Sequence, residues 1–275
     1  MGNLGPSQSW RTCTRHVRET EVVGPSGTEY GERGMDRQEY WRQRYTEVRP
    51  EWTPTTAIYA RLADDLVHHD TRVLDIGCGH ADLVASSLAR TERAIGIDVD
   101  ERALAANEVF RYRVAADAER LPFRPGSFDL VLMAWVLEHI AHPVSAFREI
   151  RRVLGPGGRI VFVTPNAWNY NAWLIRMVPN AFHAFFTSRL YGRPAEDTYP
   201  TRYRLNSVRR LQVTLPGLGY ERERIVLNGD PTYIALNELF FRVGVLLERI
   251  YDLRPLRRAR VHIVGVYRTP RSSGA

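Results

Sequence analysis

Short apolar runs alternate with amphipathic stretches between about residues 72 and 166. The apolar runs are rich in β-branched residues and predict strands at 73–76, 94–99, 112–115, 129–134 and 159–164. Apolar residues at helical spacing between these runs predict helices at 81–90, 101–110 and 144–154. Such alternation is typical of a parallel sheet with helices on both faces. The middle of the chain is therefore predicted to be an α/β domain.

Different patterns on either side of this domain divide the chain into four parts: 1–34, 35–70, 71–166 and 167–275. The first part has no apolar period, so we predict a disordered extension and a translation start at Met35. The second part predicts a helical cover of two helices. The last part predicts two further strands, at 221–227 and 261–267, and an apolar helix within 233–253.

Composition narrows the class of protein. Hydrophobic residues make up 44% of the 275 residues and charged residues 25%, as in soluble globular proteins, and no apolar run approaches the ~20 residues of a membrane span. Two cysteines, Cys13 and Cys78, favour neither a disulfide framework nor a Cys-based zinc site, so we predict no metal centre. With no signal-peptide pattern at the start, we predict a cytoplasmic protein.

The basic residues are unusual in kind and in place. All 38 are Arg, which we attribute to a coding bias, and residues 202–275 hold 14 of them against six acidic residues. Residues 1–201 carry a net charge of only −1. The basic last quarter could contact phosphates or an anionic membrane, or it could simply be a solvated surface. Nucleic acid is not favoured as a partner, because these Arg are scattered through apolar segments and no nucleic-acid motif is present.

Three acidic or Gly-rich sites follow the predicted strands. Asp75 precedes a turn in which Gly77 and Gly79 permit positive φ and close approach of a ligand. Asp82 stands where a dinucleotide motif needs its third Gly, and a carboxylate at Asp75 suits a cationic group such as an ammonium. Asp98, 23 residues after Asp75, can accept from both hydroxyls of a ribose, although such a residue is often only a helix cap. A carboxylate after the third strand could accept from an adenine amine.

The ordered segments VLDIGCGHADL, GIDVD, ADAERLPFRPGSFDLVLMAWVLEH and REIRRVLGPGGRIVFVTPN resemble the class I S-adenosylmethionine-dependent methyltransferases. The closest likeness is to the small-molecule, methyltransferase type 11-like branch, over residues 72–166. The resemblance implies S-adenosylmethionine as cofactor and a Rossmann-like seven-stranded sheet. Helices would cover both faces, the last strand would be antiparallel, and helical insertions would lie on the acceptor side.

The resemblance also assigns nine positions to the cofactor: Asp75, Gly77, Cys78, Gly79, Asp98, Val99, Asp117, Ala118 and Ala134. Asp75, Gly77 and Gly79 would border the methionine moiety, and Asp98 would hold the ribose with Val99 against the adenine. Asp117 and Ala118 would lie by the adenine amine and ring, and Ala134, with Trp135, beside the sulfonium and the acceptor. Residues 155–158 would be a structural turn. Ala81 departs from the family's frequent third Gly, and Gly155 stands where Lys is common.

Methyl transfer to a hydroxyl is helped by a general base, and one candidate follows the fourth strand. His139 can take a proton near neutral pH as a neutral imidazole. Glu138 and His142 lie beside it in the sequence. The alternative is that the Glu138–His139 pair only forms hydrogen bonds within the scaffold.

The acceptor side is built from the last part of the chain. Seven aromatic residues between 168 and 191 predict a lid, or alternatively a packed helical pair. Residues 203–207 resemble a segment of methyltransferases encoded with bacterial cell-surface polysaccharide or lipid pathways, although Asn206 or Ser207 could simply cap a helix. With the apolar helix and the basic charge, this favours a lipid-linked or membrane-proximal acceptor and a peripheral position at the inner face of the membrane.

The predicted function is methyl transfer from S-adenosylmethionine to an oxygen atom of a small-molecule or lipid- or glycan-linked acceptor, by in-line displacement. A soluble quinone- or polyketide-type metabolite is an alternative acceptor. A member that binds the cofactor without catalysis is a further alternative. A single sequence leaves the acceptor and the oligomeric state open.

Overall fold

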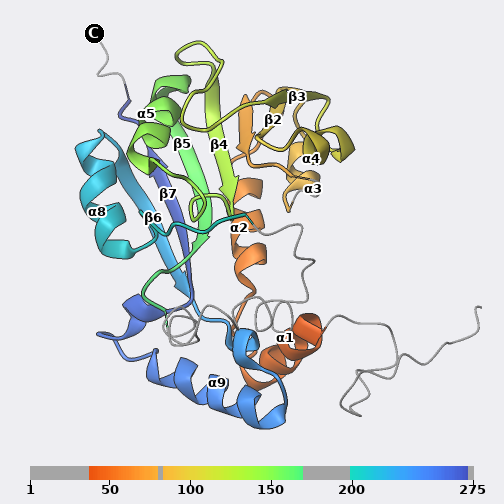
Figure 1. Cartoon of the computed structure of the whole chain (residues 1–275), viewed down its shortest axis with the longest axis vertical. Coiled ribbons are helices and arrows are strands. Elements are labelled where there is room, and N and C mark those ends of the chain that lie inside the picture. Colours follow the sequence, from red (N-terminus) through yellow and green to blue (C-terminus); the bar gives the residue numbers. More distant parts are fainter. Residues whose placement is uncertain (1–36, 80–82, 170–198, 272–275) are drawn as a thin grey trace, which may run out of the picture.

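The computed structural model describes residues 37–79, 83–169 and 199–271, and its centre is a sheet of seven strands (Figure 1). The strands are β1 (Val73–Ile76), β2 (Ala94–Asp98), β3 (Tyr112–Ala115), β4 (Phe128–Ala134), β5 (Leu154–Pro165), β6 (Glu221–Asn228) and β7 (His262–Arg268). Their order is β3-β2-β1-β4-β5-β7-β6. The pairs among β1 to β5 are parallel, and β7 is antiparallel to both neighbours. The predicted Rossmann-like sheet with an antiparallel last strand is confirmed.

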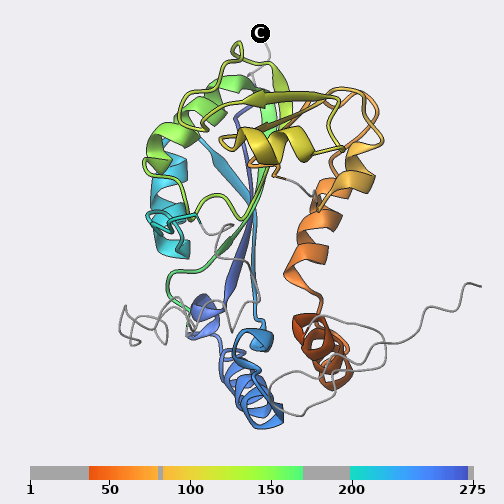
Figure 2. The ribbon, with the colours of Figure 1, turned by 45° about the vertical axis from the view of Figure 1, so that its right-hand side comes forward.

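Helices cover both faces of the sheet, as predicted (Figures 1 and 2). One face is covered by α2 (Thr55–Asp64), α3 (Ala85–Leu88) and α4 (Glu101–Ala106), and the other by α5 (Pro143–Val153) and α8 (Val208–Gly217). Helix α2 buries Tyr59 against the strands, together with Leu62 and Ala63, which follow it by three and four residues and so lie on the same face of the helix. Burial of these side chains fixes α2 beside β5 and β7.

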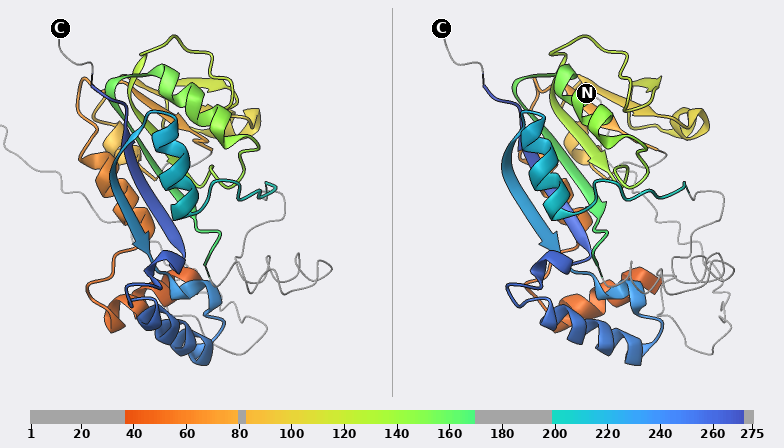
Figure 3. Two further views of the ribbon diagram at one scale, coloured as in Figure 1. Left: turned by 90° about the vertical axis from the view of Figure 1, so that its left-hand side faces the viewer. Right: turned by 60° about the vertical axis from the view of Figure 1, so that its left-hand side comes forward.

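A third group of helices lies beyond one end of the sheet (Figure 3). It consists of α1 (Arg37–Val48), the 3₁₀ helix η2 (Pro231–Ile234) and α9 (Glu238–Ile250), with the short η3 (Arg257–Ala259) following. The Trp41 ring stacks on Phe241 with 4.8 Å between the ring centroids, and Tyr45 is buried beside them. The first two helices of the predicted cover therefore separate, since α1 packs on α9 while α2 packs on the sheet.

Three helices are shorter than their apolar pattern predicts. The Asn107 side chain accepts from the backbone N–H groups of Val109 and Phe110, which ends α4 at residue 106 rather than 110. Asn237 caps α9 by accepting from the N–H of Phe240, so the apolar segment is divided between η2 and α9. Helix α3 covers only residues 85–88 of the predicted 81–90, and residues 80–82 lie outside the described part.

Strand β5 begins five residues earlier than predicted. Leu154 pairs with Phe128, and the next pair is Arg159 with Leu130, so the residues between them form an irregular excursion. Gly157 has a φ of 73°, which few other residues adopt. The predicted turn at 155–158 therefore lies inside the strand as a bulge.

Candidate cofactor and acceptor site

The loop after β1 presents backbone to open space. Gly77 and Gly79 have φ of 70° and 52°, and the N–H groups of Gly77 and Cys78 donate to the carbonyl of Ile97 at 2.8 and 3.1 Å. A Cβ on Gly77 would lie 2.2 Å from Val136 Cγ2, whereas a Cβ on Gly79 would meet no atom of the described residues within 4 Å. Gly77 is therefore needed for packing, and the open side of Gly79 leaves room for a ligand against the backbone.

Asp98 joins the ends of β1 and β2. Its Oδ2 accepts from the N–H of Gly79 at 2.9 Å, and its Oδ1 accepts from the N–H of Asp100 at 3.0 Å. The N-cap of α4 is Asp100 rather than Asp98, because the Asp100 carboxylate accepts from the N–H groups of Arg102 and Ala103. Asp98 thus holds the glycine loop instead of capping the helix.

Asn107 is a loop-holding residue that the sequence analysis missed. It is fully buried, and its Nδ2 donates to the carbonyls of Cys78 (3.3 Å) and Gly79 (2.8 Å). The backbone carbonyls of Cys78 and Gly79 thereby each accept a hydrogen bond from the Asn107 side chain, which holds the loop in place. The only signal in the sequence is a polar residue within an apolar helical pattern.

The other predicted cofactor residues lie at or after the carboxyl ends of the parallel strands, and they differ in how deeply they are buried. Asp75 and Ala118 are buried, and Ala134 is half-buried at the end of β4. Cys78 points into the core, where its Sγ and the Phe110 ring pack over the bare Cα of Gly96. Val99 is 63% exposed, which is high for an apolar side chain. Asp117 is exposed, and its Oδ1 accepts from the N–H of Glu119 at 2.9 Å.

A buried polar network lies where β4 and β5 end. Trp135 follows β4 with a φ of 58°, rare for a residue with a side chain, and its N–H donates to the carbonyl of Val163 at 3.0 Å. Thr164 Oγ1 donates to the buried Glu138 carboxylate at 2.9 Å, and Asn206 Nδ2 donates to Thr164 Oγ1 at 2.5 Å. Glu138 therefore serves the scaffold, joining segments far apart in the sequence.

His139 stands at the surface beside this network. Its Nδ1 lies 3.2 Å from the carbonyl oxygen of Pro200, and its ring meets Tyr199 edge-on at 6.0 Å. Tyr199 in turn donates its hydroxyl to Asp100 Oδ2 at 2.8 Å. Residues 199 and 200 thus connect the loop after β4 to the loop after β2. His142 is exposed, and its hydrogen bonds in the described part of the chain use its backbone, with the N–H donating to Glu119 at 2.7 Å and the carbonyl accepting from Ser145 and Ala146.

His262, at the start of β7, was not predicted from the sequence and is fully buried. Its Nδ1 lies 2.9 Å from Thr55 Oγ1, its Nε2 lies 2.9 Å from the Tyr233 hydroxyl, and its ring meets Trp135 at 4.9 Å. Burial lowers the pKa of His262 from 6.5 to about 3, and the charge of Arg42 adds to this effect. The ring is therefore neutral at physiological pH.

The hydrogen bonds around His262 also indicate its tautomer. Thr55 Oγ1 accepts from Asn228 Nδ2 at 2.9 Å, and within the described residues the only acceptor for its own proton is His262 Nδ1. A single hydroxyl has one proton to donate, so the imidazole proton is on Nε2 and is donated to Tyr233. The network runs from α2 to η2, next to Trp135.

Some predictions fall on residues that the structure does not describe. The start at Met35 and the extension before it lie there, as does most of the aromatic segment proposed as a lid. Of the two predicted caps, Ser207 caps α8 and accepts from the N–H of Arg210 at 3.3 Å. Asn206 instead joins the buried network.

Comparison with known proteins indicates a family. Residues 74–162 match the model of a methyltransferase domain. A ubiquinone biosynthesis O-methyltransferase from Aromatoleum aromaticum is 28% identical over 56% of this chain and 76% of its own. A demethylmenaquinone methyltransferase from Symbiobacterium thermophilum is 38% identical over 32% of this chain and 40% of its own. The chain spans about three fifths of the length of the Pseudomonas ubiquinone biosynthesis O-methyltransferases that it matches.

The fold also has solved relatives. The geranyl diphosphate C-methyltransferase from Streptomyces coelicolor A3(2) superposes with a TM-score of 0.52 over 77% of each chain, at 14% identity. That structure is a complex with Mg²⁺, geranyl diphosphate and S-adenosyl-L-homocysteine. At this identity the likeness concerns the fold alone.

Proposed function

This chain is a class I S-adenosylmethionine-dependent methyltransferase, and we propose that it methylates an oxygen atom of a small-molecule or lipid- or glycan-linked acceptor. S-adenosylmethionine is its cofactor. The observation that carries the proposal is the glycine loop, where Gly79 is bonded to Asp98 and Gly77 packs against Val136 of the loop that also bears His139. A cofactor site and a candidate base thus share one edge of the sheet.

The residues at this edge fit the cofactor. Among the described residues, none comes within 4 Å of the position that a Cβ on Gly79 would take, and exposed Val99 offers an apolar contact for the adenine. Both Asp98 oxygens already accept from backbone N–H groups. Each carboxylate oxygen can accept more than one hydrogen bond, so Asp98 retains the capacity to accept from ribose hydroxyls. Asp75, Gly77 and Asp117 would complete the site as the family resemblance implies.

For this reaction the protein has to position the acceptor oxygen against the methyl group and to accept the hydroxyl proton of the acceptor. The cofactor supplies a methyl group made electrophilic by its sulfonium, for in-line displacement by the acceptor oxygen. Because a carbonyl oxygen can only accept, the contact of His139 Nδ1 with the Pro200 carbonyl places the proton of the neutral ring on Nδ1, and Nε2 is then the atom that would take the acceptor hydroxyl proton. Trp135, fixed by its backbone bond to Val163 and by His262, would shape the acceptor side.

Helix α9 supports an acceptor at a membrane. One face packs Phe241 and Val245 into the α1–η2 cluster. The opposite row, spaced three or four residues apart, is apolar and exposed: Leu239 (68%), Val243 (42%), Leu246 (59%), Ile250 (40%) and Leu253 (58%). A helix on an aqueous surface normally has one polar face. A contiguous exposed apolar row of this kind is typical of an interaction surface.

The charges beside this row favour an anionic bilayer as the partner. Arg249, Arg254 and Arg258 are exposed and have no ion-pair partner in the described part of the chain. The nearby acids are already paired, Glu238 with Arg242 and Asp252 with Arg49 and Arg260. No helix in the described ranges could span a membrane. The proposed contact is therefore peripheral, with apolar side chains at the interface and Arg near the headgroups.

Flotation with vesicles of phosphatidylglycerol and phosphatidylcholine at low salt tests this contact. The protein is expected to float with the vesicles, and the double variant Leu239→Glu, Leu246→Glu is expected to stay at the bottom, because two charges would enter the apolar row. Val213→Glu on α8 is the matched control, since Val213 is 71% exposed on another helix, and it should float. Flotation of the double variant to the same extent, or of neither protein, would contradict the proposal.

The proposed reaction is tested with S-adenosylmethionine labelled in its methyl group and an extract of the source cells. We expect label in the lipid-soluble fraction that depends on the protein. Label confined to soluble metabolites would favour the second candidate acceptor, a quinone- or polyketide-type compound, which the relatives named for ubiquinone biosynthesis support. If no fraction gains label although the protein binds S-adenosylhomocysteine, the proposed reaction fails and a cofactor-binding role is favoured.

A further inference from the structure

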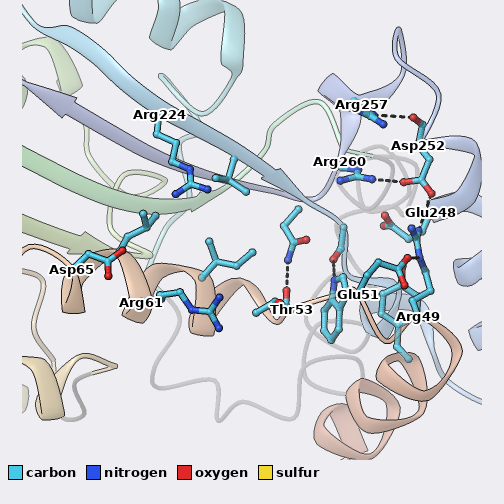
Figure 4. A pocket seen from close by; sticks show the side chains of 17 residues that line it. Arg49, Glu51, Thr53, Arg61, Asp65, Arg224, Glu248, Asp252, Arg257 and Arg260 are labelled. Carbon is cyan, nitrogen blue, oxygen red and sulfur yellow. Dashed lines mark hydrogen bonds and ion pairs between the residues drawn. The ribbon is translucent and has the colours of Figure 1, made fainter.

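A hollow of about 600 Å³ lies on the sheet face that α2 covers, between α2, the loop after α1, β6 and the end of α9 (Figure 4). It is large enough for a small ligand, whose sites are commonly 300–1,000 Å³. None of the residues assigned to the cofactor, nor His139, lines it. The methyl-transfer site described above therefore does not explain this hollow.

The charged groups in the hollow fall into two sets. At the α9 end, Arg49 pairs with Glu51 and Asp252, and Arg260 pairs with Asp252. Figure 4 shows these interactions gathered around Asp252. Arg49 and Arg260 are therefore already paired with carboxylates of the protein, while Arg257 donates its Nε–H to the backbone carbonyl of Asp252 at 2.8 Å.

At the other end, Arg61 on α2 and Arg224 on β6 stand on opposite walls (Figure 4). Within the residues that the structure describes, neither side chain has a hydrogen-bond or ion-pair partner. Asp65 lies one helical turn from Arg61 and also lines the hollow, yet the two do not pair. The two exposed arginines outnumber the one carboxylate at this end, which leaves a cationic excess that an anion could pair with.

The surface between the two ends is partly apolar, and its polar residue Asn228 already donates its Nδ2 to the Thr53 carbonyl and to Thr55 Oγ1. Ile58 and Leu62 of α2 face Val226 of β6 across the hollow, and Trp52 closes it with its indole N–H donated to the carbonyl of Gly229 at 2.8 Å. Because that polar atom is satisfied, the Trp52 ring offers only its apolar surface. A ligand here would need an apolar body as well as an anionic group.

We propose that this hollow binds an amphipathic anion, with its phosphate or carboxylate between Arg61 and Arg224 and its apolar body against Ile58, Leu62 and Val226. Guanidinium groups bind phosphate and carboxylate by paired N–H donors, which gives both strength and geometry. The ligand would be held apart from the methyl-transfer site. This proposal does not depend on the acceptor proposed above.

Octyl phosphate is the first probe, titrated by calorimetry against the intact protein. We expect saturable binding, weakened at least tenfold in the double variant Arg61→Gln, Arg224→Gln. Arg209→Gln on α8 is the matched control, because Arg209 is exposed and outside the hollow, and it should bind as the intact protein does. Equal melting temperatures of the variants would show that the loss is not unfolding.

Three further arms define the ligand class. Octanoate should bind at the same site, while inorganic phosphate and octanol, each lacking one half of the ligand, should bind at least tenfold more weakly. If phosphatidic acid vesicles compete with octyl phosphate for the hollow, the ligand is a bilayer lipid, and the proposal is supported. If octyl phosphate binds and the vesicles do not compete, the ligand is a free amphipathic anion, and the proposal is supported as well. Absence of saturable binding, equal affinity in the double variant, or equal affinity for inorganic phosphate overturns it. Methyl transfer is not measured, so this failure is separate from failure of the proposed function.

Discussion

Replacing His139 by Gln is expected to lower kcat by about 10²- to 10³-fold while leaving the affinity for S-adenosylhomocysteine unchanged. The reason is that general-base catalysis contributes about 10²- to 10⁴-fold, and Gln cannot take the acceptor proton. His139 lies beside the Pro200 carbonyl and does not contact the glycine loop in any described hydrogen bond. Turnover is measured as labelled acceptor formed, and cofactor affinity by calorimetry.

Two further variants serve as controls, one for turnover and one for cofactor affinity. His142→Gln should keep full turnover, because His142 is exposed and its only described hydrogen bonds use the backbone. Asp98→Asn should weaken cofactor affinity by about tenfold or more, since a charged acceptor is lost to both the ribose and the Gly79 N–H. If His139→Gln turns over at the normal rate, the residue has no role in proton transfer.

The free energy of unfolding is expected to fall steadily as the pH drops below 6.5, and His262 is the main cause. Its pKa is 6.5 in the unfolded chain and about 3 in the folded protein. Between these values the unfolded chain binds a proton that the folded protein does not bind, so acid favours unfolding. At most this lowers stability by about 4 kcal/mol between pH 6.5 and pH 3, at roughly 1.4 kcal/mol per pH unit. Above pH 6.5 the loss vanishes.

Urea unfolding at pH 8, 7, 6 and 5 measures this dependence. His262→Gln is expected to be less stable at pH 8 by about 1–3 kcal/mol, because Gln cannot satisfy both Thr55 and Tyr233 in the same geometry. Its stability should nevertheless change less with pH than that of the intact protein. His68→Gln, an exposed control, should keep the original slope. Parallel slopes for the intact protein and His262→Gln would exclude this explanation.

Much of the fold could be predicted because each strand carries its own signal. The runs ending at Ile76, Asp98 and Ala134 are apolar, β-rich and bounded by turn residues, and the structure places their ends within about a residue of the expectation. The ends of the helices were harder to predict from the sequence. The apolar period continues past Asn107 and across Asn237, but their side chains compete for backbone N–H groups and end or begin the helices there.

The site was predictable to the extent that it follows strand ends. Asp98 and Gly79 belong to separate motifs, and their direct hydrogen bond follows from adjacent parallel strands. The His262 network was not predictable, because Thr55 and His262 are 207 residues apart and neither lies in a motif. Glu138 illustrates the same limit, since its buried partner Thr164 is an ordinary strand residue in the sequence. Long-range polar pairs depend on packing that a periodic pattern does not contain.

The position of β7 between β5 and β6 also has a consequence for the order in which the molecule assembles. Among the described strands, β6 pairs with β7 alone. Strands β5 and β7 pair residues roughly a hundred positions apart, such as Pro165 with His262. The five parallel strands can associate through nearer contacts, whereas β6, β7 and the His262 network must enter together. A partly folded chain could therefore have its cofactor edge formed while its acceptor side is still missing.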